Sequence, residues 1–164
     1  MFKKGDYVIY KRDVVKIADI KINGLNQQEY YVLIPVNDES LKIDVPIDNR
    51  LGYLRSLITK SAVKNLIKKI PEIPLIETNN KLIENDYKML MSDGSHESLI
   101  KIIKTTYLRN KERLDNNKKV SDKDNYYFNL AEKYLYNEIA YTLGISYDDV
   151  REYILKEVIK LIKD

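Results

Sequence analysis

The sequence contains no cysteine, no tryptophan and a single histidine, His96. Without cysteine there is no disulfide framework and no thiolate metal site, and one histidine cannot form a histidine cluster around a metal ion. No stretch approaches the roughly 18 uncharged residues of a membrane span, and no apolar segment follows Lys3 and Lys4 as it would in a signal peptide. We therefore expect a cytoplasmic protein with no membrane contact, no metal site and no cofactor.

Recognisable catalytic groups are missing as well. Glu39, Asp44 and Asp48 lie close together in the sequence. Carboxylates near strand ends are usually solvated, however, and neither a histidine nor a further catalytic motif accompanies these three. We expect no enzyme and no small-molecule substrate.

The first third of the chain has the pattern of short β-strands. Runs rich in β-branched and aromatic residues cover 7–10, 14–17, 30–34 and 41–45, and turn residues separate them. Short strands with hairpin-sized connections favour a small antiparallel barrel, and fewer than about 60 residues suit a Tudor-like or SH3-like one. The segment 45–49 ends the strands, because Pro46 cannot donate to a β-ladder.

From Ser61 onward the apolar periodicity is helical. Ser61 is expected to cap a first helix that Pro71 stops, and further helices are predicted over 81–91 and 97–113, after Ser121 as cap, and after Ser146 as cap. The sequence thus predicts an α+β fold in two domains. Residues 1–58 form the small antiparallel β-barrel, and residues 59–164 form an all-α bundle of four to five helices.

Positive charge is expected to gather in one segment. The whole chain carries a net +3, whereas residues 97–119 contain seven basic and three acidic residues. Lys101, Lys104 and Lys111 fall on the helix face opposite the apolar one, and Arg109 and Arg113 flank them. This face either presents cations to a polyanion or is an ordinary solvated surface. The two arginines can also pair with acids of the next helix, such as Glu132 or Glu138.

Several motifs, in order, resemble the CarD/CdnL family of bacterial transcription regulators. In the β-rich part they are Phe2-x-x-Gly5-Asp6-x-Val8-Ile9-Tyr10, Tyr30-Tyr31-Val32-Leu33, and Val45-Pro46-Ile47-Asp48-Asn49 followed by Gly52-Tyr53-Leu54-Arg55. In the helical part they are 107–113, Lys118-Lys119-Val120-Ser121 and Ala131-Glu132-Lys133. The resemblance therefore covers nearly the whole chain.

The resemblance implies a Tudor-like domain that binds the β subunit of RNA polymerase and a helical domain that contacts promoter DNA, backbone and minor groove, and stabilises the open complex. An exposed strand edge can add a strand to a partner sheet. The predicted polymerase-binding residues are therefore Leu41, Lys42, Ile43, Asp44, Val45 and Pro46. The predicted DNA-binding residues are Thr78, Lys101, Lys104, Arg109, Lys111, Arg113, Lys118 and Lys119.

Thr78 is included because relatives commonly have a tryptophan near this place, which wedges against DNA at the edge of the melted region. This sequence has no tryptophan. Any wedge must therefore be weaker or be supplied by another residue.

Three other readings stay open. The protein can be an interaction module without DNA binding, in which the basic helix only aids solubility. The segment 139–153 has the spacing of a helix-turn-helix, although Asp148 and Asp149 at the start of its second helix oppose entry into the major groove. The barrel can itself bind nucleic acid independently of polymerase, although nine basic and eight acidic residues in 1–58 leave no basic groove.

Overall fold

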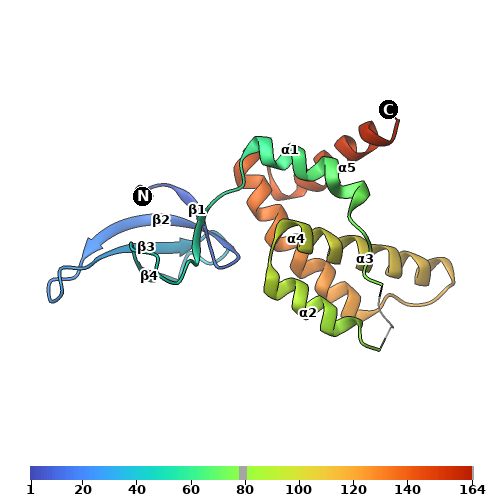
Figure 1. The fold of residues 1–164 in the computed structure, drawn as a ribbon, viewed down its shortest axis with the longest axis horizontal. Helices are drawn as coiled ribbons and strands as arrows, with labels where there is room; N and C mark the ends of the chain where they lie inside the picture. Colours follow the sequence, from blue (N-terminus) through green and yellow to red (C-terminus); the bar gives the residue numbers. More distant parts are fainter. Residues whose placement is uncertain (78–80, 164) are drawn as a thin grey trace.

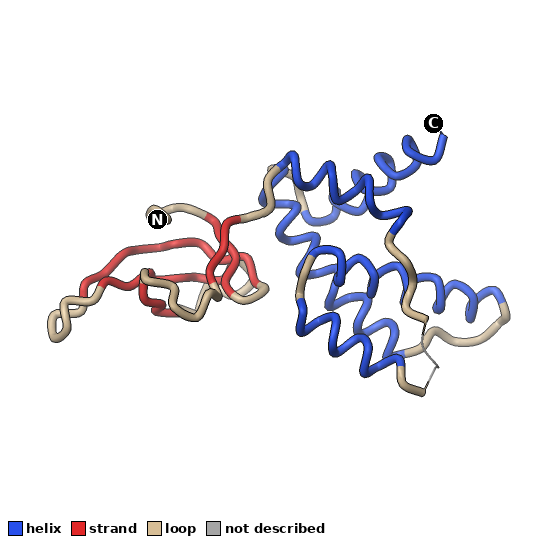
Figure 2. Tube along the Cα trace, viewed as in Figure 1, coloured by secondary structure: helices blue, strands red, loops and turns tan. Residues whose placement is uncertain are grey.

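A computed structural model describes residues 1–77 and 81–163, with residues 162 and 163 described by backbone alone. Five strands come first and five α-helices follow them. The strands form one end of an elongated molecule and the helices form the other (Figure 1). Strands and helices do not intermix (Figure 2). The α+β class and the order of its parts agree with the sequence prediction.

The N-terminal sheet is antiparallel and has the strand order β4-β3-β2-β1-β5. β4 and β5, at its two ends, each pair with a single neighbour among the described strands, so the sheet is open and the predicted closed barrel is not confirmed. The bounds are Tyr7–Tyr10 for β1, Asp13–Ile22 for β2, Glu29–Pro35 for β3, Ile43–Pro46 for β4 and Leu54–Ser56 for β5.

Two details of the sheet differ from the prediction. Leu41 and Lys42 precede β4 rather than belong to it, because the strand begins at Ile43. The sequence prediction also missed β5, whose three residues are too few to show a period of two and which pairs with the distant β1.

The helical part contains α1 (Lys60–Lys69), the 3₁₀ turn η1 (Ile70–Glu72), α2 (Ile83–Asp93), α3 (His96–Asp115), α4 (Asp122–Leu143) and α5 (Tyr147–Lys163). Ser121 caps α4 by accepting from Asp124 N, and Gly144 ends it in the left-handed conformation, both as predicted. The Ser61 cap is wrong. Thr59 has the same capping chemistry two residues earlier, and its side chain accepts from Ala62 N.

Each part of the chain has its own apolar core. Val8, Val15, Ile17, Tyr31, Leu33 and Leu54 are buried together in the sheet. The larger helical core extends from Val63 in α1 to Ile154 in α5, and α3 packs against α4 more extensively than any other two helices in the described part of the chain pack together. That residues 1–58 and 59–164 are independent domains stays a prediction.

The buried carboxylate of Glu138 on α4 joins the two parts. Its side chain is 3% exposed and accepts two hydrogen bonds from the Arg55 guanidinium of β5, at 2.7 and 2.8 Å. It also accepts from Ile58 N at 2.7 Å and lies 2.8 Å from His96 Nε2. Burial alone would raise the pKa of this carboxyl, but the hydrogen bonds and charges of Arg55 and His96 lower it to about 2. Three groups, on β5, the connector and α3, thus make four contacts with one anion.

Candidate nucleic-acid interface

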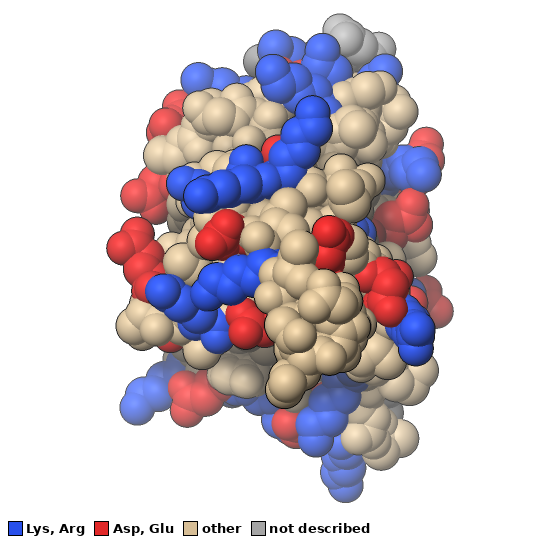
Figure 3. All heavy atoms as spheres, turned by 90° about the vertical axis from the view of Figure 1, so that its left-hand side faces the viewer, with Lys and Arg blue, Asp and Glu red and all other residues tan. Residues whose placement is uncertain are grey.

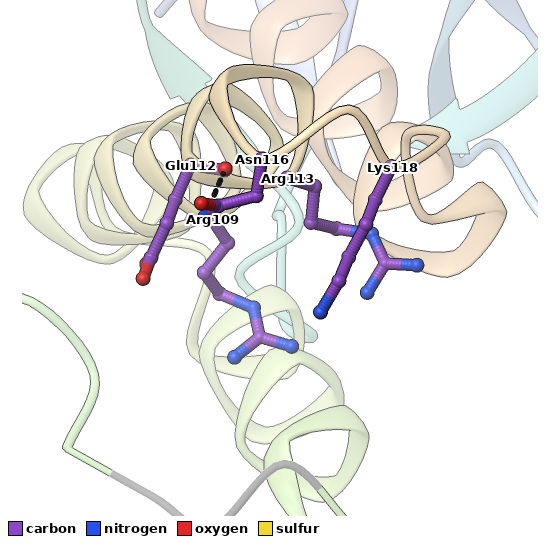
Figure 4. A pocket seen from close by; sticks show the side chains of 5 residues that line it. All are labelled: Arg109, Glu112, Arg113, Asn116 and Lys118. Carbon is purple, nitrogen blue, oxygen red and sulfur yellow. Dashed lines mark hydrogen bonds between the residues drawn. The ribbon is translucent and has the colours of Figure 1, made fainter.

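A basic hollow lies at the C-terminal end of α3. It has a volume of about 190 Å³ and is lined by Arg109, Glu112, Arg113, Asn116 and Lys118. The side chains of Arg109, Arg113 and Lys118 reach toward this hollow from the last turns of α3 and from the loop that follows (Figure 4). We call these five residues the basic hollow. Three cations and one carboxylate leave it positively charged.

The loop after α3 is fixed to the helix by backbone and side-chain hydrogen bonds. Asn117 takes a positive φ of 58°, which reverses the chain, and Lys118 N then donates to Arg113 O at 2.8 Å. Arg113 Nε in turn donates to Lys119 O at 2.8 Å. The bond from Asn116 Nδ2 to Glu112 O, at 2.9 Å, is the dashed line in Figure 4. Lys118 is thereby held beside Arg113.

Arg109 is positioned by a buried acid of α4. Its Nε donates to Asp124 Oδ2 at 2.9 Å, and the other oxygen of Asp124 accepts from Tyr87 OH at 2.8 Å. Asp124 is 1% exposed, and burial together with this carboxylate raises the pKa of the Tyr87 hydroxyl. The pairing of Arg109 with an acid of the next helix is thus confirmed. The two acids named as examples have other partners, because Glu138 pairs with Arg55 and Glu132 pairs with Arg151.

The ammonium group of Lys104 is bound within the protein, which corrects its predicted place on the solvated face of the helix. Its Nζ donates to Ile70 O and to Ile73 O, each at 2.7 Å, and desolvation lowers the pKa of the ammonium. The segment that follows α1 crosses α3 here, and the carbonyl oxygens of Ile70 and Ile73 point toward the Lys104 ammonium. Helical periodicity alone cannot show that another segment covers the face opposite the apolar one.

The other predicted cations divide by exposure. Lys111, Arg113, Lys118 and Lys119 are exposed, whereas Lys101 is half-buried. Thr78 lies outside the described residues. The structure therefore brings Arg109, Arg113 and Lys118 together, with Lys111 and Lys119 nearby in the sequence.

Asp124 and Tyr87 are positioning residues that the sequence prediction missed. A signal for Asp124 exists in the spacing Ser121-x-x-Asp124, which is that of a helix N-terminus. That spacing predicts an exposed acid that favours the helix dipole, not a buried one that holds an arginine.

The outer edge of the sheet is β4. Ile47 N donates to Glu29 O at 3.2 Å, and the register pairs Val45 with Tyr31 and Ile43 with Leu33. Because bonded and non-bonded pairs alternate in an antiparallel ladder, Val45 and Ile43 direct their backbone groups to β3. Asp44 and Pro46 therefore direct their backbone groups outward, away from β3. Because Pro46 faces outward, its missing N–H removes no hydrogen bond between β4 and β3. The side chain of Asp44 is exposed as well.

The face at the sheet end of the molecule carries charges of both signs. Figure 3 shows acidic side chains interspersed with basic ones over its middle and lower parts. This mixture agrees with the near-neutral balance of residues 1–58 and offers no continuous basic groove on that face.

No protein-family model matches this chain, and no curated protein matches it. The resemblance to the CarD/CdnL family therefore depends on the motifs quoted above. Of the helices in the described part of the chain, none is both long and apolar enough to cross a membrane. Residues 1–77 and 81–163 also contain no group of three histidine or carboxylate side chains arranged to hold a metal ion.

Proposed function

We propose that the protein is a transcription regulator that links RNA polymerase to promoter DNA and stabilises the open complex. The β4 edge would bind the polymerase β subunit, and the basic hollow would bind the phosphate backbone of promoter DNA. The observation that carries the proposal is the basic hollow. Its two arginines are held in place, Arg109 by Asp124 and Arg113 by the carbonyl of Lys119, and the hollow lies at the far end of the molecule from the sheet (Figure 1).

The basic hollow suits phosphate binding without sequence reading. Arginine and lysine donors contact phosphate oxygens and release counterions, which gives affinity that depends on salt and is largely indifferent to sequence. Cations that are already oriented lose less side-chain entropy when a phosphate binds. We expect Lys111 and Lys119 to add contacts beyond the hollow itself.

The β4 edge suits the addition of a partner strand. Its free backbone groups at Asp44 lie between the half-buried side chains of Ile43 and Val45. Strand addition gains affinity from main-chain hydrogen bonds and specificity from alternate side chains. The edge is short, which limits pairing with unrelated chains.

Replacing Asp44 with proline is expected to abolish binding to a fragment of the β subunit, with a loss of at least about tenfold. Proline removes the outward N–H of the edge but no bond to β3, so the sheet should still fold. The measurement is a titration of the β fragment with the full chain. Asp44→Ala is the matched control, because it removes the carboxylate and keeps the N–H. A folded Asp44→Pro protein with unchanged affinity would rule out strand addition at β4.

The pair of substitutions Arg113→Gln and Lys118→Gln is expected to flatten the salt dependence of duplex binding. Each lost phosphate contact lowers the slope of log K against log salt by about 0.9, so the double variant should lose about 1.8. The loss should be equal on unrelated duplexes. Lys21→Gln with Lys133→Gln removes the same charge elsewhere and should leave the slope unchanged. If the slope of the Arg113→Gln/Lys118→Gln protein equals that of the wild type, the hollow does not bind phosphate.

An interaction module without DNA binding has one observation in its favour. A largely apolar groove of about 260 Å³ lies between α3 and α4, and Tyr107, Leu114, Val120 and Phe128 contribute to its lining. The salt titration separates this reading from the first, because an apolar groove gives no counterion release.

A further inference from the structure

Two adjoining hollows lie where the sheet meets the helices. One has a volume of about 230 Å³ and the other of about 540 Å³, and both are lined by Lys11, Arg12, Tyr53, Ser92 and Tyr134. We call the space that these five residues line the junction hollow. They come from the β1–β2 turn, the segment before β5, the last turn of α2 and the middle of α4, so both parts of the molecule contribute (Figure 1). The junction hollow shares no residue with the basic hollow or with β4.

The β1–β2 turn supplies two cations to this space. Tyr10 pairs with Asp13, which leaves Lys11 and Arg12 as a two-residue turn, and Lys11 takes a positive φ of 59°. Lys11 N donates to Tyr53 O at 2.8 Å, and Lys11 Nζ lies 5.1 Å from the centre of the Tyr53 ring. The turn and the Tyr53 ring are thereby held beside each other.

Arg12 differs from the other arginines because it lacks an acceptor. It is half-buried, and within the described residues its guanidinium makes no ion pair and no hydrogen bond. The other five arginines each have an acceptor: Arg50 pairs with Asp48, Arg55 with Glu138, Arg109 with Asp124, Arg113 with the carbonyl of Lys119, and Arg151 with Glu132. Withdrawing a guanidinium from water without supplying an acceptor is unfavourable. A bound anion would supply the acceptor.

Arg12 and the hydroxyl of Tyr134 face the same space. A Cβ atom added to Gly94 would lie 3.6 Å from Arg12 Nε, so the guanidinium group lies against the backbone between α2 and α3. Burial raises the pKa of the Tyr134 hydroxyl, the charge of Asp13 raises it further, and the charge of Arg12 lowers it. Within the described residues this hydroxyl has no hydrogen-bond partner. A cation and a hydroxyl group are therefore both available to a ligand.

The acids that line the two hollows do not pair with the cations of the turn. Asp93 accepts from the Ser98 hydroxyl at 2.6 Å, Glu138 is bound by Arg55, and Asp13 is exposed. The lining carries three basic and three acidic side chains, namely Lys11, Arg12 and Arg55 against Asp13, Asp93 and Glu138. This balance leaves too little positive charge for a polyphosphate chain and suits a ligand with one phosphate group.

We propose that the junction hollow binds a nucleoside monophosphate. Arg12 and Lys11 would bind the phosphate, because a guanidinium presents its donors in a fork that matches phosphate oxygens. The hydroxyls of Ser92 and Tyr134 would donate further hydrogen bonds, and the base would stack on the exposed ring of Tyr53. The larger hollow has the volume of a typical small-molecule site. This inference does not depend on the proposed function, because it uses neither the β4 edge nor the basic hollow.

Calorimetric titration of the full chain with AMP tests the inference. Arg12→Gln should raise the dissociation constant at least about tenfold, because charge-assisted hydrogen bonds are lost. Arg50→Gln is the matched control, since it removes an exposed guanidinium outside both hollows and should leave the dissociation constant unchanged. Ser92→Phe replaces an exposed side chain and fills the hollow, so it should also weaken AMP binding at least about tenfold. This variant decides the question if Arg12→Gln fails to fold.

Adenosine and inorganic phosphate should each bind at least about tenfold more weakly than AMP, because each lacks one half of the ligand. A wild-type protein that binds no AMP at about 1 mM would overturn the inference. Equal dissociation constants for the wild type and a folded Arg12→Gln or Ser92→Phe protein would also overturn it, and so would inorganic phosphate that binds as tightly as AMP. A duplex of about 20 base pairs that displaces AMP would assign the junction hollow to nucleic acid instead.

The same variants separate this inference from the proposed function. Ser92→Phe should leave binding of the β fragment and the salt slope of duplex binding at their wild-type values. Loss of AMP binding with both values unchanged therefore supports a distinct site. A change in either value would show that the junction hollow is not separate from the surfaces that bind polymerase and DNA.

Discussion

Replacing Glu138 with alanine is expected to lower the free energy of unfolding by about 3 kcal/mol. The substitution leaves the N–H of Ile58 without its acceptor and removes the anion that Arg55 and His96 share. The side chain of Arg55 is 44% exposed, so water can solvate its guanidinium once the carboxylate is gone. The expected loss of stability is therefore at the lower end of the range for breaking a buried ion pair. The measurement is chemical denaturation followed by circular dichroism. Glu152→Ala is the control, because its pair with Lys156 is exposed and should contribute less than about 1 kcal/mol.

The same carboxylate predicts how stability depends on pH. The pKa of Glu138 is lowered from 4.5 to about 2 in the folded protein. Its contribution is therefore fully present above pH 4.5 and is lost as the pH falls toward 2. The difference in pKa corresponds to about 3 kcal/mol, in agreement with the alanine estimate. Glu138→Gln should flatten the stability profile between pH 2 and 4.5. An unchanged profile, or an alanine variant as stable as the Glu152→Ala control, would show that the junction contributes little.

Asp124→Ala is expected to destabilise the protein by about 3 kcal/mol and also to weaken DNA binding. The buried hydroxyl of Tyr87 would lose its acceptor, which costs about 1–3 kcal/mol. Arg109 would lose the carboxylate that orients it toward the basic hollow. If Arg109 contacts a phosphate, the salt slope should fall by about 0.9 as well. Denaturation and duplex titration measure the two effects separately.

Asp122→Ala is the matched control for Asp124→Ala. Both acids lie in the first turn of α4, so both substitutions lose a favourable helix-dipole interaction, but Asp122 is exposed. Any difference between the variants therefore measures the contacts with Tyr87 and Arg109. If the two variants are equally stable, the contacts of Asp124 with Tyr87 and Arg109 add no stability beyond the helix-dipole interaction that both variants lose. A stable Asp124→Ala protein with a normal salt slope would remove Arg109 from the binding surface.

The parts of the fold that could be predicted depend on neighbours in sequence. Ser121 and Gly144 were recognised because a cap acts within three or four residues of its own position. β5 was not recognised, because its pairing with β1 joins positions more than forty residues apart. The choice of Ser61 over Thr59 was wrong, since both residues can cap and only the entry of the chain into α1 decides between them.

The candidate site shows the same division. Local charge identified Arg113 and Lys118, whose meeting depends on a loop of a few residues. Lys104 was assigned to the same surface, but carbonyls of Ile70 and Ile73 bind it from a segment about thirty residues away. The side chain of Asp124 can be buried because the hydroxyl of Tyr87, on the distant helix α2, donates a hydrogen bond to its carboxylate.

The most direct test of the account is the affinity of the full chain for promoter DNA with and without RNA polymerase from the organism that encodes it. A protein that links the two should bind a polymerase–promoter complex about a hundredfold or more tightly than the free promoter, because the second contact becomes intramolecular. Asp44→Pro should remove this gain and leave affinity for free DNA unchanged. Equal affinity of the wild type for free and polymerase-bound promoter would contradict the proposal that the protein links polymerase to DNA.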